Sequence, residues 1–357
     1  MKKLIIISII LIFALTLWFN RGGVDTIYKD HAPAQPIPEE FEPTILWPKT
    51  VDDKKMAGEA SGVAVNSSGD IYYLHRGSAN YGGEKIIEEP TVIVLDGQTL
   101  EVKEKWGENQ FLSPHGLEID HKDNIWITDI SLNKVYKFSP GGKLVQEFGD
   151  DYPFYMEVVL RIRNKLSNFP TGMSKSTFAR PTDVTVLQDG SFVVSDGYRN
   201  RRIVKFDKNG QFLWEKNKLG TSAGEFNLPH GISSDDQHIY VADRSNARVQ
   251  IFTHEGDYIE DWDQSELGRP FGIEADSKGS IYVADGGDTL YPKSGDGTHQ
   301  IVILNNDGQI KQRFGTYGTA LGQLNIPHDI AVDQKGNIYV AELRNNRLQM
   351  FAKKNEE

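Results

Sequence analysis

The sequence of 357 residues contains no cysteine. This absence excludes disulfide bonds, thiolate metal ligands, a cysteine nucleophile and a lipid-modified cysteine anchor. Any site for a transition metal must therefore use histidine and carboxylate ligands. Positive charge is also in deficit, because 39 Lys and Arg stand against 50 Asp and Glu and give a net charge of −11. Since nucleic-acid phosphates are bound by clustered Lys and Arg, we expect no nucleic-acid partner.

One long apolar run, residues 4–19, follows Lys2 and Lys3 at the amino terminus. Its sixteen residues fall between the core of an export signal and the roughly 17–25 residues of a spanning helix. No clear A-x-A cleavage site follows, so we favour a retained signal anchor over a cleaved signal peptide for residues 1–23; a buried core helix is the third option. In either preferred case the body is exported to the cell surface or the periplasmic face, anchored by residues 4–19 or secreted after cleavage.

The next segment, residues 24–42, holds three prolines and predicts an extended tether. The remainder, residues 43–357, repeats one pattern: Pro-x-Gly/Asp-apolar-x-apolar, a polar turn, and a strand such as Ile-Tyr-Val-Ala-Asp. Alternating strands joined by Asp-Gly, Lys-Gly or Asn-Gly turns indicate hairpins. A period of about 40 to 50 residues with four strands describes the blades of an all-β propeller. The six copies begin at Ser61, Pro114, Pro181, Pro229, Pro270 and Pro327.

The sixth copy ends too soon to hold a fourth strand, so we expect the segment from Thr44 to Trp47 to supply it. An amino-terminal strand would then close the ring and leave no open sheet edge. A second irregularity lies between copies two and three, where an insertion at about 151–178 has apolar residues at helical spacing. This short helix is either a structural cap or a lid that faces the substrate. Its apolar residues are Met156, Val159, Leu160, Ile162 and Leu166.

The first strand of each blade lines the central channel, so equivalent positions form a ring. At the position after the initial Pro the six copies carry Ser61, His115, Thr182, His230, Phe271 and His328. Histidine thus occupies every second blade, about 120° apart, and the three imidazoles can converge on one axial point. Three neutral imidazoles with an open position form the ligand set of a catalytic zinc. For a single one of them, a hydrogen-bonded core histidine is the alternative; the other six histidines we expect to be solvated.

Two carboxylates, Asp183 and Asp329, each follow a ring position by one residue. Asp329 suits a second, harder cation with oxygen ligands, whereas Asp183 suits a turn cap equally well. Arg76 stands at the end of the second strand of copy one, where other copies have an acidic residue that defines the repeat; Tyr198 and Arg244 lie at the corresponding rim of copies three and four. Arginine can hold a substrate carboxylate, and a tyrosine near a cation can act as a base. Taken singly, each of the three is equally compatible with a surface residue.

Several of these segments resemble the peptidyl-α-hydroxyglycine α-amidating lyases, the zinc-dependent half of the peptide-amidating system. That family consists of six-bladed propellers of the NHL-repeat type. The resemblance covers roughly residues 45–351, and its three Pro-His motifs in alternate blades, with Ser-Asp-Gly-Tyr between them, are far more specific than NHL repeats in general. The matching segments are SGVAV, SPHGLEIDHKDNIWITD, RPTDV, VSDGYRNRRIVKF, LPHGI and IPHDIAVDQKGNIYVAE.

The resemblance implies that His115, His230 and His328 bind zinc. It also implies that Tyr198 is the base and that Arg76, helped by Arg244, holds the carboxylate. A structural calcium would be bound by the Asp329 side chain and the backbone carbonyls of Val63 and Leu117. The chain departs from animal members by lacking disulfides and by having Ile326 where they often have Met. It contains no copper-monooxygenase domain that would make hydroxyglycine.

These observations predict a monomeric, exported, zinc-dependent lyase. It would cleave the C–N bond of peptidyl-α-hydroxyglycine-like carbinolamides to an amide and glyoxylate, with a small molecule or peptide bearing a terminal carboxylate as substrate. Two alternatives remain open. One is a non-catalytic exported NHL propeller that binds a peptide, glycan or protein; the other is a calcium-dependent propeller lactonase or related hydrolase, whose channel would be richer in carboxylates.

Overall fold

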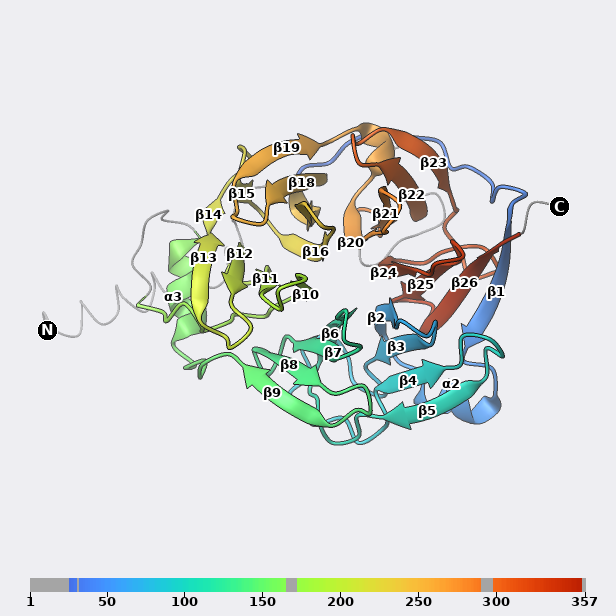
Figure 1. The fold of residues 1–357 in the computed structure, drawn as a ribbon, viewed down its shortest axis with the longest axis horizontal. Helices are drawn as coiled ribbons and strands as arrows, with labels where there is room; N and C mark the ends of the chain where they lie inside the picture. Colours follow the sequence, from blue (N-terminus) through green and yellow to red (C-terminus); the bar gives the residue numbers. More distant parts are fainter. Residues whose placement is uncertain (1–25, 31, 165–171, 290–297, 355–357) are drawn as a thin grey trace, which may run out of the picture.

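The computed structural model describes residues 26–30, 32–164, 172–289 and 298–354. Six four-stranded antiparallel sheets surround a central axis, as the blades of a propeller (Figure 1). Within each sheet the first strand is innermost and the fourth lies at the perimeter. The predicted all-β, six-bladed propeller is therefore confirmed.

The first three blades follow the chain in order. Blade 1 contains β2 (Ala60–Val65), β3 (Ile71–His75), β4 (Val92–Leu95) and β5 (Val102–Trp106). Blade 2 contains β6 (Pro114–Ile119), β7 (Ile125–Asp129), β8 (Lys134–Phe138) and β9 (Leu144–Phe148). Blade 3 contains β10 (Asp183–Val186), β11 (Phe192–Asp196), β12 (Arg202–Phe206) and β13 (Phe212–Lys216).

The other three blades complete the ring. Blade 4 contains β16 (Pro229–Ser234), β17 (His238–Asp243), β18 (Arg248–Thr253) and β19 (Tyr258–Trp262). Blade 5 contains β20 (Pro270–Ala275), β21 (Ser280–Asp285), β22 (Gln300–Asn305) and β23 (Ile310–Phe314). Blade 6 contains β24 (Pro327–Val332), β25 (Ile338–Glu342), β26 (Arg347–Lys353) and β1 (Phe41–Trp47).

Blade 6 joins the two ends of the chain, because β1 pairs antiparallel with β26 from Phe41 opposite Lys353 onward. The predicted closing strand is thus confirmed, and it starts at Phe41 rather than at Thr44. Leu46 and Trp47 are each only 1% exposed and pack with Tyr73 of blade 1. The closing strand therefore supplies core to two blades as well as hydrogen bonds to one.

Period-two alternation explains how the blades pack on one another. In β3, Tyr72 and Leu74 face Leu117 of blade 2, whereas Tyr73 between them faces Tyr339 of blade 6. Successive side chains of a strand point to opposite faces of its sheet, and here both faces are covered by neighbouring blades. The central strands are consequently buried on both sides.

The acidic residues that end the second strands are structural, as predicted. Asp129 accepts hydrogen bonds from the backbone N–H groups of Leu112 and Ser113, both at 2.9 Å. Each carboxylate thereby ties the connection that enters its own blade to the end of the second strand. The equivalent residues are Asp196, Asp243, Asp285 and Glu342.

Short helices occupy the connections. The predicted helix between blades 2 and 3 is α3 (Met156–Arg163), at the edge of the ring beside β12 and β13 (Figure 1). The others are α2 (Val51–Met56), η1 (Arg244–Asn246) and η2 (Ser265–Leu267), and a small parallel pair joins β14 (Lys218–Leu219) to β15 (Glu225–Phe226).

The predicted amino-terminal hydrophobic helix lies outside the described residues. Within the described ranges, no helix combines the length and apolar character needed to cross a bilayer. The segment predicted as a tether runs along the propeller rather than away from it: Ile27 donates its N–H to the Ser245 carbonyl at 2.8 Å, and Arg313 donates to the Pro33 carbonyl at 2.8 Å.

The expectation of solvated histidines was wrong at two positions. His75 and His299 are fully buried. His75 lies against Trp47 and Tyr73, with ring centroids 5.6 and 5.5 Å away, and burial lowers its pKa to about 4. Both residues occupy strand ends that the entering connections cover, which strand patterning alone does not reveal.

The closing strand should carry much of the stability. We predict that Leu46→Ala lowers the free energy of unfolding by about 2–5 kcal/mol, because it leaves a cavity between blades 6 and 1. Urea unfolding of the purified chain measures this. Val51→Ala, at a position that is 72% exposed, should change the midpoint little; equal effects of the two substitutions would contradict the assignment.

Candidate metal centre and cleft

The structure brings the three predicted histidines together on the channel axis. His115, His230 and His328 stand on the innermost strands of blades 2, 4 and 6 and are almost fully buried. Their ring centroids are 4.7 to 4.9 Å apart, and one nitrogen from each lies within 4.8 Å of the others. Among the described residues this is the one group of His, Cys, Asp and Glu whose geometry fits a metal ion.

A hydrogen bond from each imidazole to the next blade fixes its orientation. The Nδ1 atoms lie 2.7, 2.9 and 2.9 Å from the backbone carbonyls of Thr182, Phe271 and Ser61. Because a carbonyl only accepts, Nδ1 carries the proton in the neutral ring and Nε2 keeps its lone pair toward the axis. The three ring positions without histidine are therefore part of the centre, a role that their side chains gave no reason to predict.

The electrostatics keep the imidazoles neutral. Burial lowers the pKa of His115, His230 and His328 well below its ordinary value. The positive charge of Arg76 acts in the same direction on all three, and that of Arg244 does so on His230 and His328. A neutral imidazole is the form that binds a metal. Three such nitrogens with no thiolate nearby suit zinc, so the residues present fit the ion that the sequence predicts.

Glycine lets the first strands approach each other at this level. A Cβ on Gly116 would lie 2.4 Å from the Asp183 carboxylate, and one on Gly272 would lie 2.7 Å from the Cα of Asp329. The choice of Gly or Asp at this position of the repeat therefore has a steric cause, because Asp183 and Asp329 each fill the space that the glycine of the preceding blade leaves. Asp183 also accepts the Ile232 N–H at 3.0 Å, so it links blades rather than capping a turn.

Tyr198 reaches the axis from the loop after β11. Its hydroxyl lies 2.9 Å from Nε2 of His115 and 3.2 Å from Nε2 of His230. Burial raises its pKa above the ordinary value, whereas Arg244 and Arg76 act to lower it. A phenol in this position touches the same nitrogens that would hold the metal.

A cavity of about 630 Å³ opens directly above the ring. It contains all three predicted rim residues, Arg76, Tyr198 and Arg244, together with His328. The aromatic ring of Tyr81 stands at 5.2 Å and nearly perpendicular to that of Tyr198. The other residues that line the cavity are Glu59, Asn80, Leu228, Phe271, Leu343 and Arg344.

The register corrects the predicted position of Arg76. In blade 1, His75 pairs with Ala60, just as Asp129 pairs with Pro114 in blade 2. His75 therefore takes the place of the acidic residue in blade 1. Arg76 is the next residue and is therefore equivalent to Arg244, which follows Asp243 in blade 4. Blades 1 and 4 are opposite each other, so the two guanidinium groups reach the cleft from opposite sides.

Glu59 is a member of the cleft that sequence reasoning missed. Its carboxylate lies 3.0 Å from Nη1 of both Arg76 and Arg344. Arg76 is 1% exposed, and its Nε donates to the Pro114 carbonyl at 3.1 Å, which leaves Nη2 as a buried donor without a hydrogen-bond partner. A buried donor of this kind is a ready contact for an anionic ligand.

Below the ring the channel is acidic. Val63, Leu117 and Asp329, the predicted calcium ligands, line one cavity of about 80 Å³, and Asp329 accepts the Val63 N–H at 2.9 Å. Glu118 and Glu274 line the same cavity. Burial, reinforced by neighbouring carboxylates, raises the pKa of both. The sequence analysis missed Glu118 and Glu274, although both are the fifth residue of their first strands. The calcium assignment stays a prediction.

Comparison with known proteins identifies the repeat and the family. The NHL repeat family matches residues 178–206, 226–252 and 324–351. A probable peptidyl-α-hydroxyglycine α-amidating lyase of Caenorhabditis elegans is 30% identical, over 70% of this chain and 75% of that protein. The chain belongs to the peptidyl-α-hydroxyglycine α-amidating lyase family.

Other relatives of this lyase family are longer. Lyase 1 of Drosophila melanogaster is 31% identical, with 82% of this chain and 57% of that protein aligned. A peptidyl-glycine α-amidating monooxygenase of Xenopus laevis is 30% identical, and the chain spans 34% of its length. A streptogramin B lyase structure shares the fold, with a TM-score of 0.58, 16% identity and coverage of 87% and 97% of the two chains.

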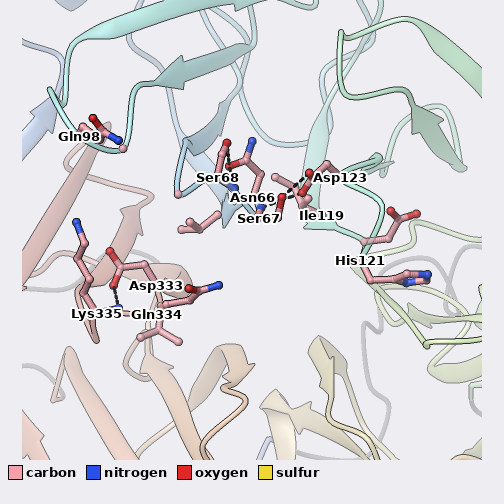
Figure 2. Close-up of a pocket in the computed structure, with 15 residues that line it drawn as sticks. Asn66, Ser67, Ser68, Gln98, Ile119, His121, Asp123, Asp333, Gln334 and Lys335 are labelled. Carbon is pink, nitrogen blue, oxygen red and sulfur yellow. Dashed lines mark hydrogen bonds between the residues drawn. The ribbon is translucent and has the colours of Figure 1, made fainter.

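A second pocket of about 460 Å³ lies on the opposite face of the lyase-family propeller. Figure 2 shows its polar turns, in which Ser67 bonds to Asp123 across blades 1 and 2. None of the predicted site residues lines it. The predicted site residues thus lie in the ring, the cleft above it and the channel below.

The ring should bind a metal on its own. We predict that the chain purified without added metal or a polyhistidine tag carries about one zinc, and that His230→Ala removes it because two imidazoles cannot replace three. Elemental analysis by mass spectrometry measures the content. His121→Ala, at the opposite face, is the control and should keep the metal; equal metal content in both variants would place the ion elsewhere.

The lowered pKa values also predict how binding depends on pH. Protons compete with the metal only below the ligand pKa of the metal-free protein, and an ordinary histidine has a pKa near 6.5. Since these three pKa values lie well below that, zinc occupancy should be unchanged between pH ~7.5 and ~6. Dialysis against buffered zinc measures it, and half-loss near pH ~6.5 would contradict the prediction.

Proposed function

We propose that the chain is an exported, zinc-dependent lyase that cleaves peptidyl-α-hydroxyglycine-like carbinolamides to an amide and glyoxylate. The observation that carries the proposal is the position of the Tyr198 hydroxyl, within 3.2 Å of Nε2 of two ring histidines. A potential base, a potential metal and a cleft with arginine on two sides therefore meet at one point. Membership of the lyase family supports the same reaction.

The reaction needs no co-reactant. The substrate hydroxyl loses its proton, its oxygen forms a carbonyl with the α-carbon, and the C–N bond breaks. The nitrogen retains the bond electrons and gains a proton, which yields the carboxamide, and the α-carbon leaves as glyoxylate. Atoms and charge balance, so the protein has to supply only a base, a proton for nitrogen and stabilisation of the developing charge.

When bound at the ring, zinc would supply Lewis acidity toward the hydroxyl oxygen. Tyr198 would accept the hydroxyl proton, and it is placed to return one to the departing nitrogen. Burial alone disfavours the phenolate, because it raises the pKa of Tyr198. Arg244 and Arg76, whose charges lower that pKa, would favour the phenolate. The aromatic ring of Tyr81 packs edge-on against that of Tyr198.

Arg76 would hold the carboxylate end of the substrate through its unpaired Nη2. Glu59 occupies Nη1 of the same guanidinium, so it fixes the plane of Arg76 and leaves one edge for the ligand. Arg244 would assist from the opposite side of the cleft, where its guanidinium lies 3.8 Å above the ring of Phe271. This arrangement selects a small anionic group close to the metal.

The protein would be exported, would bind a second cation and would act on substrates that carry a carboxylate. The apolar run at residues 4–19 supports export with a retained anchor. Val63, Leu117 and Asp329 would bind a structural calcium in the channel, since carbonyl and carboxylate oxygens are its preferred ligands. We expect the protein to act as a monomer on peptides or small molecules that bear a terminal carboxylate.

The direct test is release of glyoxylate from an α-hydroxyglycine compound such as α-hydroxyhippurate. We predict that Tyr198→Phe keeps the metal and lowers kcat by about 10²- to 10⁴-fold, the usual contribution of a general base. Tyr136→Phe, in blade 2 outside the cleft, is the control. An unchanged kcat in Tyr198→Phe would remove this residue from the mechanism, and absence of glyoxylate with the metal-loaded wild type would refute the lyase.

A further inference from the structure

The helix α3 lies on the same face of the propeller as the cleft. Arg163 donates from Nη1 to the Asn200 side chain at 3.1 Å, and Arg199 donates from Nε to Glu157 at 2.6 Å. Arg199 and Asn200 belong to the loop that carries Tyr198. The helix is therefore attached to this loop at the edge of the ring (Figure 1).

Exposed apolar side chains lie in the turn before this helix and in its first turn. Met156 and Leu160 are buried against the propeller, whereas Phe154 is 90%, Tyr155 51% and Val158 39% exposed. Phe154 and Tyr155 form the turn immediately before the helix, and Val158 lies in its first turn. Exposed apolar side chains clustered in this way mark a contact surface.

The described chain also begins on this face. The backbone of Ile27 donates to the Ser245 carbonyl at 2.8 Å and accepts from Arg269 at 2.6 Å, and Lys29 donates to the Ala247 carbonyl at 2.8 Å. Ser245 directly follows Arg244 of the cleft. Tyr28, between the two anchored residues, is 68% exposed.

The distance to a membrane is therefore limited. Seven residues, 20–26, separate the apolar run 4–19 from Ile27, and an extended chain covers at most ~3.3–3.6 Å per residue. A bilayer that holds the run lies within roughly 25 Å of the point where Ile27 is fixed. Exposed aromatic residues on that face would meet the interfacial region, where tyrosine and other aromatic side chains are favoured.

We propose that the face bearing the cleft rests on the lipid surface, with Phe154 and Tyr155 of the α3 edge inserted among the headgroups. The contact adds to the one that residues 4–19 would make. It rests on a retained anchor and is independent of the lyase reaction, so the two proposals can fail separately. It places the mouth of the cleft at the membrane and the polar pocket of Figure 2 away from it.

Because the chain contains no cysteine, a cysteine introduced by substitution can be labelled specifically. Phe154→Cys and Gln334→Cys, the latter exposed at the opposite face, are introduced separately into the full chain and labelled with the same fluorophore. Each protein is reconstituted in phosphatidylcholine vesicles with and without doxyl-labelled phosphatidylcholine. We expect doxyl lipid to quench the label at 154 several-fold more strongly than the label at 334. Equal quenching, or a chain that does not stay with the vesicles, overturns the proposal.

An iodide titration of the same samples identifies a different occupant. If the apolar run of the same chain covers α3, the label at 154 is protected from both iodide and doxyl lipid. If the patch awaits a protein partner, the label is open to iodide and not to lipid. Either result overturns the membrane contact, whereas quenching by lipid with protection from iodide supports it.

Discussion

The structure depends on three hydrogen bonds between neighbouring blades, from the Nδ1 atoms of the ring histidines to the carbonyls of Thr182, Phe271 and Ser61. Each bond sets the tautomer of one imidazole and turns its Nε2 to the axis. The last of them, from His328 to Ser61, crosses the seam between blade 6 and blade 1. The histidine ring is therefore complete only when β1 has closed the propeller, which couples folding of the chain to assembly of the site.

Charge around the axis is arranged in layers. Arginines lie above the ring, neutral imidazoles form it, and carboxylates line the channel below. Burial of each layer alone would cost free energy, and other contacts offset this cost. Glu59 pairs with Arg76 and Arg344, while backbone N–H groups donate hydrogen bonds to Asp183 and Asp329. A cation at the ring and another in the channel would complete this compensation.

Much of this could be predicted from the sequence because a propeller repeats one local pattern. Period-two alternation and turn residues identified the blades, the missing fourth strand identified the closure by β1, and the shared register brought His115, His230 and His328 to one level. These inferences succeed because equivalent positions of a repeat are equivalent in space. The same comparison of equivalent positions identified Tyr198 as a rim residue, and it lines the cleft.

The failures come from contacts between copies that differ. Arg76 was placed one residue early because blade 1 has His75 where other blades have an acid. Glu59 escaped notice because its partner Arg344 is 285 residues away. The burial of His75 and His299 and the exposure of Phe154 and Tyr155 depend on connections that carry no repeat. Tertiary packing decides these features, and no local pattern encodes them.

The central claim, that a metal at the histidine ring performs lyase chemistry, is tested most directly by titrating the metal-free full chain with zinc while glyoxylate release is followed. The account predicts that activity rises linearly and stops rising at one zinc per chain. Activity that is complete before zinc is added, or no glyoxylate at any zinc concentration although the metal binds, would contradict it.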